Sequence, residues 1–272
     1  MMWILILIAV ITILYIAAIS PRSEKREDMR PFLHIMFAHR GYHCMEKGIP
    51  ENSMKAFRAS IKKGYGIELD LHLSKDGQLV VFHDDTLARM CGRSHAVEDL
   101  TAEELTRLRL LDTAETIPLF SDVLSLVKGR VPLLIELKIP TSALAICEET
   151  FRQLKDYRGP YLIQSFNTMG LSWFKQNAPD VLRGQLSCNL TAKKGKEPWI
   201  FRFLIQHLLC NHLGRPDFIS YKLSDLPTFN VWVLKYFFKT PVAVWTLRSA
   251  SALKKGKEEY DMQIFEKPYE NY

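Results

Sequence analysis

Two short stretches of the chain hold the residue types that phosphodiester chemistry needs. The first contains His39 and Arg40, and the second places Glu68 and Asp70 ahead of His83. Each group stands where an extended apolar run ends, so folding can bring the groups to one edge of a sheet. Carboxylates hold divalent cations, arginine binds phosphate, and histidine transfers protons near neutral pH. Together these residues indicate hydrolysis of a phosphodiester.

The acidic residues follow a pattern suited to a metal site. Glu68 and Asp70 lie two residues apart on an expected strand, so their side chains share one face. Two carboxylates inside a barrel repel each other and resist ionisation unless a cation is bound. Glu136 and Lys138 repeat this alternation at the end of another apolar run. We expect Glu68, Asp70 and Glu136 to hold one Mg²⁺ or Ca²⁺ and Lys138 to contact phosphate. The alternative for each pair is an ion pair at a strand end.

The two histidines come from separate segments that the fold must bring to one rim. We predict that His39 and His83 form an acid–base pair and that Arg40 binds the phosphate. Glu51 precedes an amphipathic helix and is a candidate supporting residue, although the Asn-Ser pair after it could simply cap that helix. The other histidines lack this context and are interpreted as surface or packing residues: His34, His43, His72, His95, His207 and His212.

Alternating strands and helices must position these residues. Eight apolar runs separated by helix-like segments predict βαβ units, an α/β fold class and a closed eight-stranded parallel barrel. The expected strands are Ile35–Ala38, Ile67–Leu71, Leu133–Leu137, Tyr161–Ser165, Leu182–Leu186, Asp217–Ser220, Val242–Thr246 and Met262–Phe265. The expected helices include Ser53–Lys63, Thr141–Leu154, Met169–Asn177, Pro198–Leu209 and Ala250–Glu259.

One apolar run does not fit this alternation. Only residues 74–78 separate Leu79–Phe82 from the region of the second strand, and this segment is too short for a crossover helix and predicts a hairpin. Residues 84–118 then form the longest stretch between barrel strands, and Thr101 is expected to cap a short helix there. We interpret this stretch as a small insertion beside the site; the alternative is a long loop without a role in specificity.

The first twenty residues differ from the rest of the 272-residue chain. Residues 3–19 carry no charge and are long enough to cross a bilayer as one helix. A cleaved signal peptide is the alternative, but no basic residue precedes the apolar run. Arg22, Lys25, Arg26 and Arg30 follow it, so the positive-inside rule predicts a single-pass protein of the cell membrane with its domain in the cytoplasm. Residues 1–20 are thus the expected anchor, 21–33 a linker and 34–272 the barrel.

Composition excludes several other classes. The five cysteines are widely spaced and include no CxxC pair, which argues against a disulfide framework or a zinc site. The net charge of +6 suits anionic lipid headgroups. It would also suit nucleic acid, but no nucleic-acid motif is present and the basic residues form no single block. We therefore expect no nucleic-acid partner.

Six segments taken in order resemble the glycerophosphodiester phosphodiesterase family, over about residues 34–272. They are HRG, PENS, IELDLHLSKDGQLVVFHDDTLARMCG, LLIELK, LIQSF and VWTL. The resemblance implies a TIM barrel with a small insertion after the second barrel strand. It also implies divalent-metal-dependent hydrolysis of glycerophosphodiesters to sn-glycerol 3-phosphate and an alcohol. The residue roles that it implies are the ones given above: Glu68, Asp70 and Glu136 for the metal, His39 and His83 for proton transfer, and Arg40 and Lys138 for phosphate.

The chain departs from the family pattern at three places. The gap from Gly41 to Pro50 is longer than in many members, Arg248 stands where many have Asn, and the last strand ends in Phe265-Glu266 where others end in Thr-Asp. None of these changes removes a candidate catalytic group. They leave the leaving-group alcohol open.

Two apolar segments leave the substrate class open as well. Residues 199–209 and 231–238 could be outer barrel helices, or an apolar rim that docks on a bilayer beside Lys193, Lys194 and Lys196. The second possibility favours lysophospholipid or another phospholipid headgroup as substrate; a teichoic-acid-like polymer would require an outward-facing domain. A non-catalytic phosphoglycerol-binding protein is a further alternative, against which the complete set of candidate ligands and histidines argues.

Overall fold

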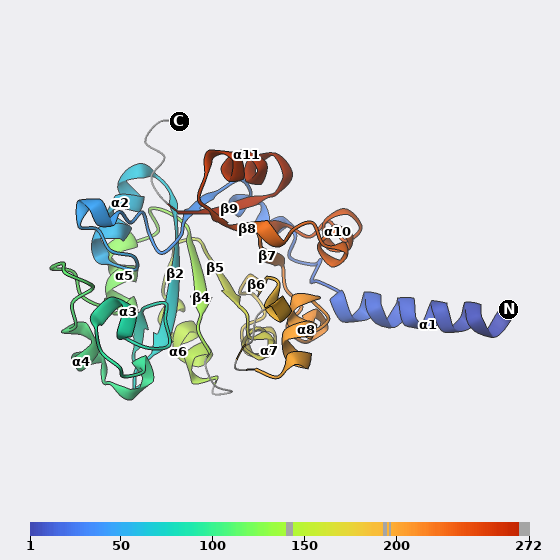
Figure 1. Cartoon of the computed structure of the whole chain (residues 1–272), viewed down its shortest axis with the longest axis horizontal. Helices are drawn as coiled ribbons and strands as arrows, with labels where there is room; N and C mark the ends of the chain where they lie inside the picture. Colours follow the sequence, from blue (N-terminus) through green and yellow to red (C-terminus); the bar gives the residue numbers. More distant parts are fainter. Residues whose placement is uncertain (140–143, 193–194, 196, 267–272) are drawn as a thin grey trace.

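Eight parallel strands close on one another, and helices cover the outside of the ring (Figure 1). The structure, a computed structural model, describes residues 1–139, 144–192, 195 and 197–266. The strand order is β1-β9-β8-β7-β6-β5-β4-β2, and pairing of β1 with β2 completes the barrel. The barrel strands are β1 Met36–Ala38, β2 Gly66–Leu73, β4 Leu133–Leu137, β5 Tyr161–Ser165, β6 Arg183–Ser187, β7 Phe218–Lys222, β8 Val242–Leu247 and β9 Met262–Phe265.

The predicted barrel is confirmed, with all eight strands close to their expected bounds. The outer helices are α2 Met54–Lys63, α5 Phe120–Val127, α6 Ala145–Leu154, α7 Thr168–Asn177, α8 Trp199–Gln206, α9 Asn211–Gly214, α10 Phe229–Tyr236 and α11 Ala250–Glu259. The helix after β4 was expected to start at Thr141, which lies outside the described residues. α8 is shorter than predicted because the chain turns after it, where Leu208 has a φ of 57°. Sequence reasoning missed α5 altogether.

The additional strand and the segment after it build one wall of the barrel mouth. β3 (Leu79–Val81) pairs antiparallel with the end of β2, as the short gap predicted. Residues 84–118 contain α3 (Ala88–Cys91) and α4 (Ala102–Thr106). The predicted cap of α4 is confirmed, because Thr101 Oγ1 accepts the Glu104 N–H at 3.3 Å. The segment has an apolar core of its own with β3, formed by Val80, Phe82, Leu87, Met90, Val97, Leu105, Leu110 and Ile117.

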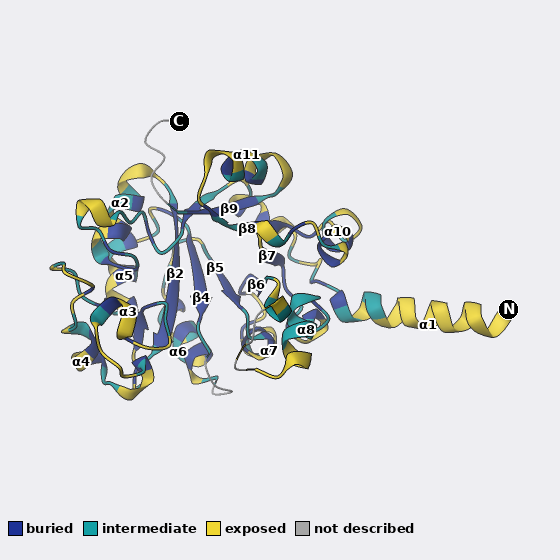
Figure 2. Ribbon diagram, in the orientation of Figure 1, coloured by how far each residue is buried: buried dark blue, intermediate teal, exposed yellow. Residues whose placement is uncertain are grey.

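The period-two pattern of β2 decides what faces the barrel interior. Ile67, Leu69 and Leu71 point outward and pack in the layer between strands and helices. Glu68 and Asp70 therefore point inward, where they are 1% and 0% exposed. Figure 2 shows that the strands are buried along their length, whereas helices such as α2, α5 and α6 have a buried and an exposed side. Because the apolar side chains of β2 pack outward, Glu68 and Asp70 are buried inside the barrel.

Residues 21–33 pack against the barrel instead of forming an extended linker. Met29 and Phe32, in a 3₁₀ helix over Glu27–Phe32, are buried with side chains from the starts of the barrel strands. Arg22 Nε and Nη2 each donate to the Asp217 carboxylate at 2.6 Å. Asp217 also accepts the Arg183 N–H at 2.9 Å. This ion pair ties the segment after the first helix to the end of the barrel opposite the site.

Replacing Asp217 with alanine should lower the free energy of unfolding by about 3 to 5 kcal/mol, because it leaves the buried guanidinium of Arg22 without its partner. Asp180→Ala is the matched control: Asp180 pairs with Lys25 but is 91% exposed, so its loss should change stability by less than about 0.5 kcal/mol. Urea unfolding of both variants measures the difference. Equal stability of the two variants would show that the buried pair does not hold this segment in place.

The first helix, α1 (Met2–Ile19), projects away from the barrel as an isolated rod (Figure 1). It is the one helix among the described residues long and apolar enough to cross a membrane, a property that signal sequences share. Only its last turns contact the domain. Ile19 is fully buried, Tyr15 Oη donates to Asn230 Oδ1 at 2.8 Å, and Asn211 Nδ2 donates to the Ile19 carbonyl at 3.1 Å.

Candidate active site

A tight turn after β1 aims His39 and Arg40 at the barrel mouth. Arg40 and Gly41 have φ angles of 55° and 78°, so two successive residues adopt left-handed backbone. A Cβ on Gly41 would stand 2.8 Å from the Ala56 Cβ, so glycine is also required for space. The Gly41 N–H points at the Ala38 and Glu68 carbonyls, at 3.1 and 3.2 Å. The turn therefore requires glycine at position 41, which explains the last residue of the His-Arg-Gly sequence.

Three buried carboxylates converge beside this turn. Ligand oxygens of Glu68, Asp70 and Glu136 all lie within 4.8 Å of one another, although Glu136 comes from β4. Glu68 accepts the Arg40 backbone N–H at 2.9 Å and forms no ion pair with any described side chain. Burial, with Asp70 and Glu136 as neighbours, raises the pKa of Glu68 well above its usual value. An arrangement that resists ionisation in this way fits a divalent cation.

Lys138 and Arg40 compensate part of this charge. Lys138 Nζ lies 3.0 Å from Asp70 Oδ1 and also pairs with Glu136. Arg40 Nε lies 3.6 Å from Asp70 Oδ2. Burial acts to raise the pKa of Asp70, but Lys138, His83 and Arg40 together hold it below its usual value. Burial raises the pKa of Glu136 even though Lys138 opposes the shift. The side chains of Lys138 and Arg40 thus both contact the carboxylates in this structure. Their contact with phosphate stays a prediction.

His83 is oriented by its neighbour in the sequence. Its Nδ1 lies 2.6 Å from Asp84 Oδ1, which favours an N–H at Nδ1 and leaves Nε2 for other contacts. Asp84 is held by Arg89, whose Nε donates to Asp84 Oδ2 at 2.6 Å. Arg89 Nη2 also donates to Glu51 Oε1 at 2.6 Å, and Glu51 Oε1 accepts Arg40 Nη1 at 2.6 Å. Glu51 therefore links the two arginines, as expected of a supporting residue.

His39 lies beside a second group of charged side chains, which was not predicted from the sequence. Glu266 Oε2 is 3.9 Å from His39 Nδ1, and Glu266 Oε1 is 3.6 Å from His43 Nε2. Arg248 pairs with the same carboxylate. His43, interpreted from the sequence as a surface or packing residue, lies in the loop before α2 with its ring beside this carboxylate and does not line the cavity. Burial, with Arg40 close by, holds the pKa of His39 well below its usual value.

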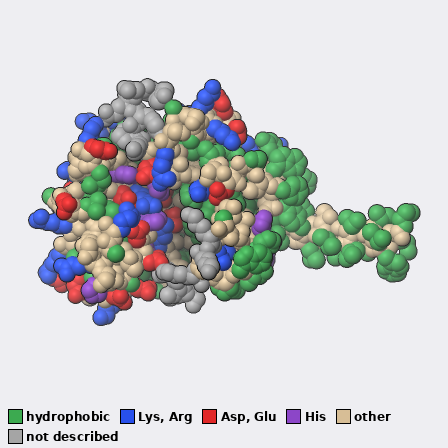
Figure 3. All heavy atoms as spheres, in the orientation of Figure 1, with side chains coloured by type: hydrophobic (Ala, Val, Ile, Leu, Met, Phe, Trp, Pro, Cys, Tyr) green, Lys and Arg blue, Asp and Glu red, His purple; other side chains and the backbone are tan. Residues whose placement is uncertain are grey.

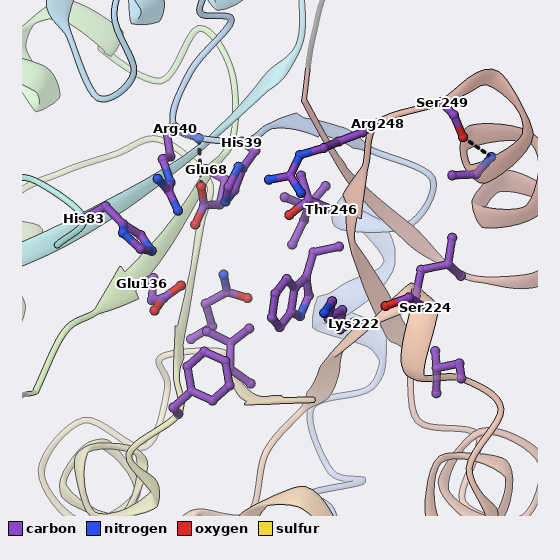
Figure 4. Close-up of a pocket in the computed structure, with 18 of the residues that line it drawn as sticks. His39, Arg40, Glu68, His83, Glu136, Lys222, Ser224, Thr246, Arg248 and Ser249 are labelled. Carbon is purple, nitrogen blue, oxygen red and sulfur yellow. Dashed lines mark hydrogen bonds between the residues drawn. The ribbon is translucent and has the colours of Figure 1, made fainter. Parts of the chain in front are cut away.

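A cavity of about 850 Å³ opens at the mouth, and the residues that line it include His39, His83, Arg40, Glu68, Glu136 and Lys138 (Figure 4). Figure 4 shows His39, Arg40, Glu68, His83 and Glu136 on one side and Lys222, Ser224, Thr246 and Arg248 on the other. The rest of the lining contains an apolar wall, formed by Phe166, Leu186, Leu223, Leu226, Trp245 and Ile264, together with polar side chains that include Lys138, Gln164, Ser249, Ser251 and Lys255. The cavity thus has one half with carboxylates and histidines, where a phosphate fits, and another in which an apolar wall lies beside the cationic side chains of Lys222 and Arg248 and can receive a second group.

The residues singled out from the sequence come together as predicted, and further contributors join them. Asn52 Nδ2 donates to Asp70 Oδ2 at 2.8 Å, so the Asn-Ser pair does more than cap α2. Ser53 does cap that helix, by accepting the Ala56 N–H. Asp84 stands next to His83 in the sequence and could have been recognised as its partner. Gln164, in register with Glu136 on β5, also lines the cavity and could have been recognised from the strand alternation. Arg89 and Glu266 reach the site only through tertiary packing.

A family model of the glycerophosphoryl diester phosphodiesterase family matches residues 39–207. The glycerophosphodiester phosphodiesterase of Caldanaerobacter subterraneus subsp. tengcongensis is 34% identical over 178 residues, which are 61% of this chain and 70% of that protein. The Bacillus altitudinis protein of the same name is 35% identical over 158 residues, which are 54% of this chain and 63% of the relative.

Solved structures show the same architecture. A glycerophosphodiester phosphodiesterase from Thermotoga maritima aligns with a TM-score of 0.65 at 26% identity, over 85% of this chain and 93% of that one. An Oleispira antarctica phosphodiesterase in complex with its product sn-glycerol-3-phosphate aligns with a TM-score of 0.70 at 24% identity, over 86% and 93%. The second likeness concerns the fold alone.

Proposed function

The chain belongs to the glycerophosphoryl diester phosphodiesterase family, and we propose that it hydrolyses glycerophosphodiesters to sn-glycerol 3-phosphate and an alcohol. The observation that carries this proposal is the convergence of three carboxylates and two histidines at one barrel mouth. Segments far apart in the chain supply them, so a purely structural origin would not account for so many ionisable groups in one cavity.

Glu68, Asp70 and Glu136 are the residues that would hold one divalent cation. Lys138 and Arg40 offset only part of their charge, and a bound cation would relieve the mutual repulsion and the cost of burial that remain. Bound there, Mg²⁺ or Ca²⁺ would supply positive charge against the oxygens of the reacting phosphate. Asn52 orients Asp70 through its hydrogen bond, and the Arg40 backbone N–H orients Glu68.

The environments of the two histidines suggest separate roles. His39 has a lowered pKa, so its ring is neutral at pH 7 and can accept the proton of the attacking hydroxyl. The His83 ring is held through Nδ1 by Asp84, which leaves Nε2 to act on the substrate, and we assign to it donation of a proton to the leaving oxygen. We assign the guanidinium of Arg40 to the phosphate, held in place by Glu51.

The apolar wall of the cavity favours a second candidate substrate. A soluble diester such as glycerophosphocholine needs no wall of leucine and aromatic side chains, whereas the acyl chain of a lysophospholipid would bury it. Lysophospholipid hydrolysis at the same phosphodiester bond is therefore the runner-up activity. The residues assigned above would act in the same way on either substrate.

Release of glycerol 3-phosphate tests the proposal. Purified full-length protein with defined Mg²⁺ or Ca²⁺ should produce it from glycerophosphocholine, as measured by a coupled glycerol-3-phosphate assay. Choline release from lysophosphatidylcholine, with the phosphate kept on the lipid, would instead establish the runner-up. Turnover of neither substrate with either cation would reject both.

We also propose that α1 spans the cell membrane and keeps the barrel on the cytoplasmic side. The helix has the length and composition of a span, and the basic residues after it set the orientation. Tyr15 and Ile19 fix its last turns to the domain, so it would act as a rigid stem and not as a loose tether.

A further inference from the structure

A group of exposed apolar side chains lies on the side of the barrel from which α1 projects. In Figure 3, hydrophobic side chains gather there, whereas charged side chains gather around the hollow of the visible face. We call this group the collar. Its seven members are each at least 50% exposed: Trp199, Ile200 and Phe201 of α8, Phe229, Trp232 and Tyr236 of α10, and Phe237. We propose that the collar is seated in the surface of the lipid bilayer around the base of α1.

The collar is continuous with the stem. The Tyr15 ring of α1 stacks on Phe229 at 6.1 Å, Phe229 on Trp232 at 6.3 Å, and Trp232 lies 5.8 Å from Tyr236. An aromatic row thus runs from the last turns of α1 along α10. α8 and α10 both lie beside the point at which α1 leaves the domain (Figure 1). A bilayer that surrounds α1 would meet this row next.

The length of the free part of α1 requires this contact. Only Met2–Leu14 stand clear of the domain, and thirteen helical residues rise about 20 Å at 1.5 Å per residue. The hydrocarbon core of a bilayer is roughly 30 Å thick. The last turns, which Tyr15 and Ile19 bind to the domain, must then also lie at membrane depth. Phe229 of the collar stacks on Tyr15 in those turns, so the α10 part of the collar enters the apolar layer with them, and α8 lies beside it (Figure 1).

The composition of the collar helices favours lipid over a protein partner. Neither α8 nor α10 contains an acidic residue, while Arg202 and Lys235 supply positive charge. Tryptophan and tyrosine are the side chains enriched where hydrocarbon meets headgroups. The neighbouring lysines at 193, 194 and 196 lie outside the described residues and are not needed for this inference. If seven exposed apolar side chains on two neighbouring helices faced water, they would favour aggregation of the protein.

Seating the collar also brings the site close to lipid. The turn before α10 carries Leu223, Ser224 and Leu226, which line the cavity. The same short segment therefore joins the membrane-facing helix to the apolar wall of the mouth. This placement accounts for an apolar wall in a cavity that otherwise binds a charged group.

Fluorescence quenching by brominated lipids tests the inference with the full-length protein in phosphatidylcholine vesicles. Trp3→Phe serves as the background, because Trp3 belongs to α1 itself. Adding Trp199→Phe and Trp232→Phe to this background should remove most of the quenched signal. Trp173→Phe is the matched control. Its indole packs against Phe151 and Phe174, so its replacement should leave the quenched signal unchanged.

The inference rests on the proposed membrane span, and the two can fail separately. A variant that keeps Trp3 but carries both collar substitutions reports insertion of α1 alone. Quenching of Trp3 without quenching of the collar would overturn the inference and leave the span in place, whereas quenching of neither would overturn both. A collar buried between two copies of the chain would be shielded from bromine, and that result also counts against bilayer seating.

Discussion

Replacing His39 or His83 with alanine should lower kcat on glycerophosphocholine by about 10²- to 10⁴-fold in each case, without loss of the fold. Each ring lines the cavity and borders the carboxylate cluster from a different strand end. Neither ring belongs to the carboxylate set, so both variants should still bind the cation. Steady-state kinetics measures the loss, and calorimetric titration with Mg²⁺ or Ca²⁺ measures the retained binding.

The two variants should respond differently to the leaving group. If His83 donates the proton, a glycerol phosphodiester with p-nitrophenol as its leaving group needs no such donor, and His83→Ala should regain most of its lost activity. His39→Ala should stay impaired on that substrate. The assigned role of His39 is to remove the proton of the attacking hydroxyl, and a better leaving group does not replace that step. Equal recovery of both variants would contradict the assignment, and near-normal rates on the alkyl substrate would remove both histidines from catalysis. His212→Ala, outside the site, is the matched control and should behave as the wild type.

Removal of the divalent cation should abolish turnover. A bound cation contributes several kcal/mol of transition-state stabilisation, and each 1.36 kcal/mol is a factor of ten, so excess EDTA should reduce the rate by about 10³-fold or more. Glu68→Gln, Asp70→Asn and Glu136→Gln should reproduce this loss in the presence of cation. Each removes one of the three charges whose oxygens lie within 4.8 Å of one another.

The carboxylate variants also carry a signature in stability. Glu68 has a raised pKa, so without cation the folded state binds more protons than the unfolded state, and this group's contribution is lost as pH rises through its folded pKa. In EDTA near pH 7, Glu68→Gln should therefore raise the melting temperature, whereas with cation it should lower it. Glu103→Gln, on the exposed surface of α4, should do neither. Undiminished activity of the wild type in EDTA would contradict the metal assignment.

The fold was largely predictable from the sequence because the barrel depends on local signals. The runs that became β4, β5 and β9 are mostly apolar, each with only one or two polar residues, and their bounds agree with prediction. α5 was missed because its short apolar stretch after Pro118 resembles a strand as much as a helix. The packing of residues 21–33 was not predicted because their polar composition suggests a linker, and only a few of them, among them Met29 and Phe32, are buried.

The site was predictable where residue type and strand position carry the information. Glu68, Asp70 and Glu136 follow from the period-two alternation that places them inside the barrel. His43 and Glu266 could not be placed in this way, since a loop and the end of the last strand bring them to His39. Likewise Arg89 contacts Glu51 across 38 positions of sequence, a contact that only the packing of residues 84–118 creates.

The central claim is that distant segments converge around one cation at a single mouth, where the phosphate is cleaved. A crystal of the full-length protein grown with Mn²⁺ and glycerol 3-phosphate tests it most directly, through the anomalous signal of the metal. The account predicts one peak among the oxygens of Glu68, Asp70 and Glu136, with the phosphate against that ion and within reach of His39, Arg40 and His83. A metal bound elsewhere, or a phosphate held away from both histidines, would contradict it.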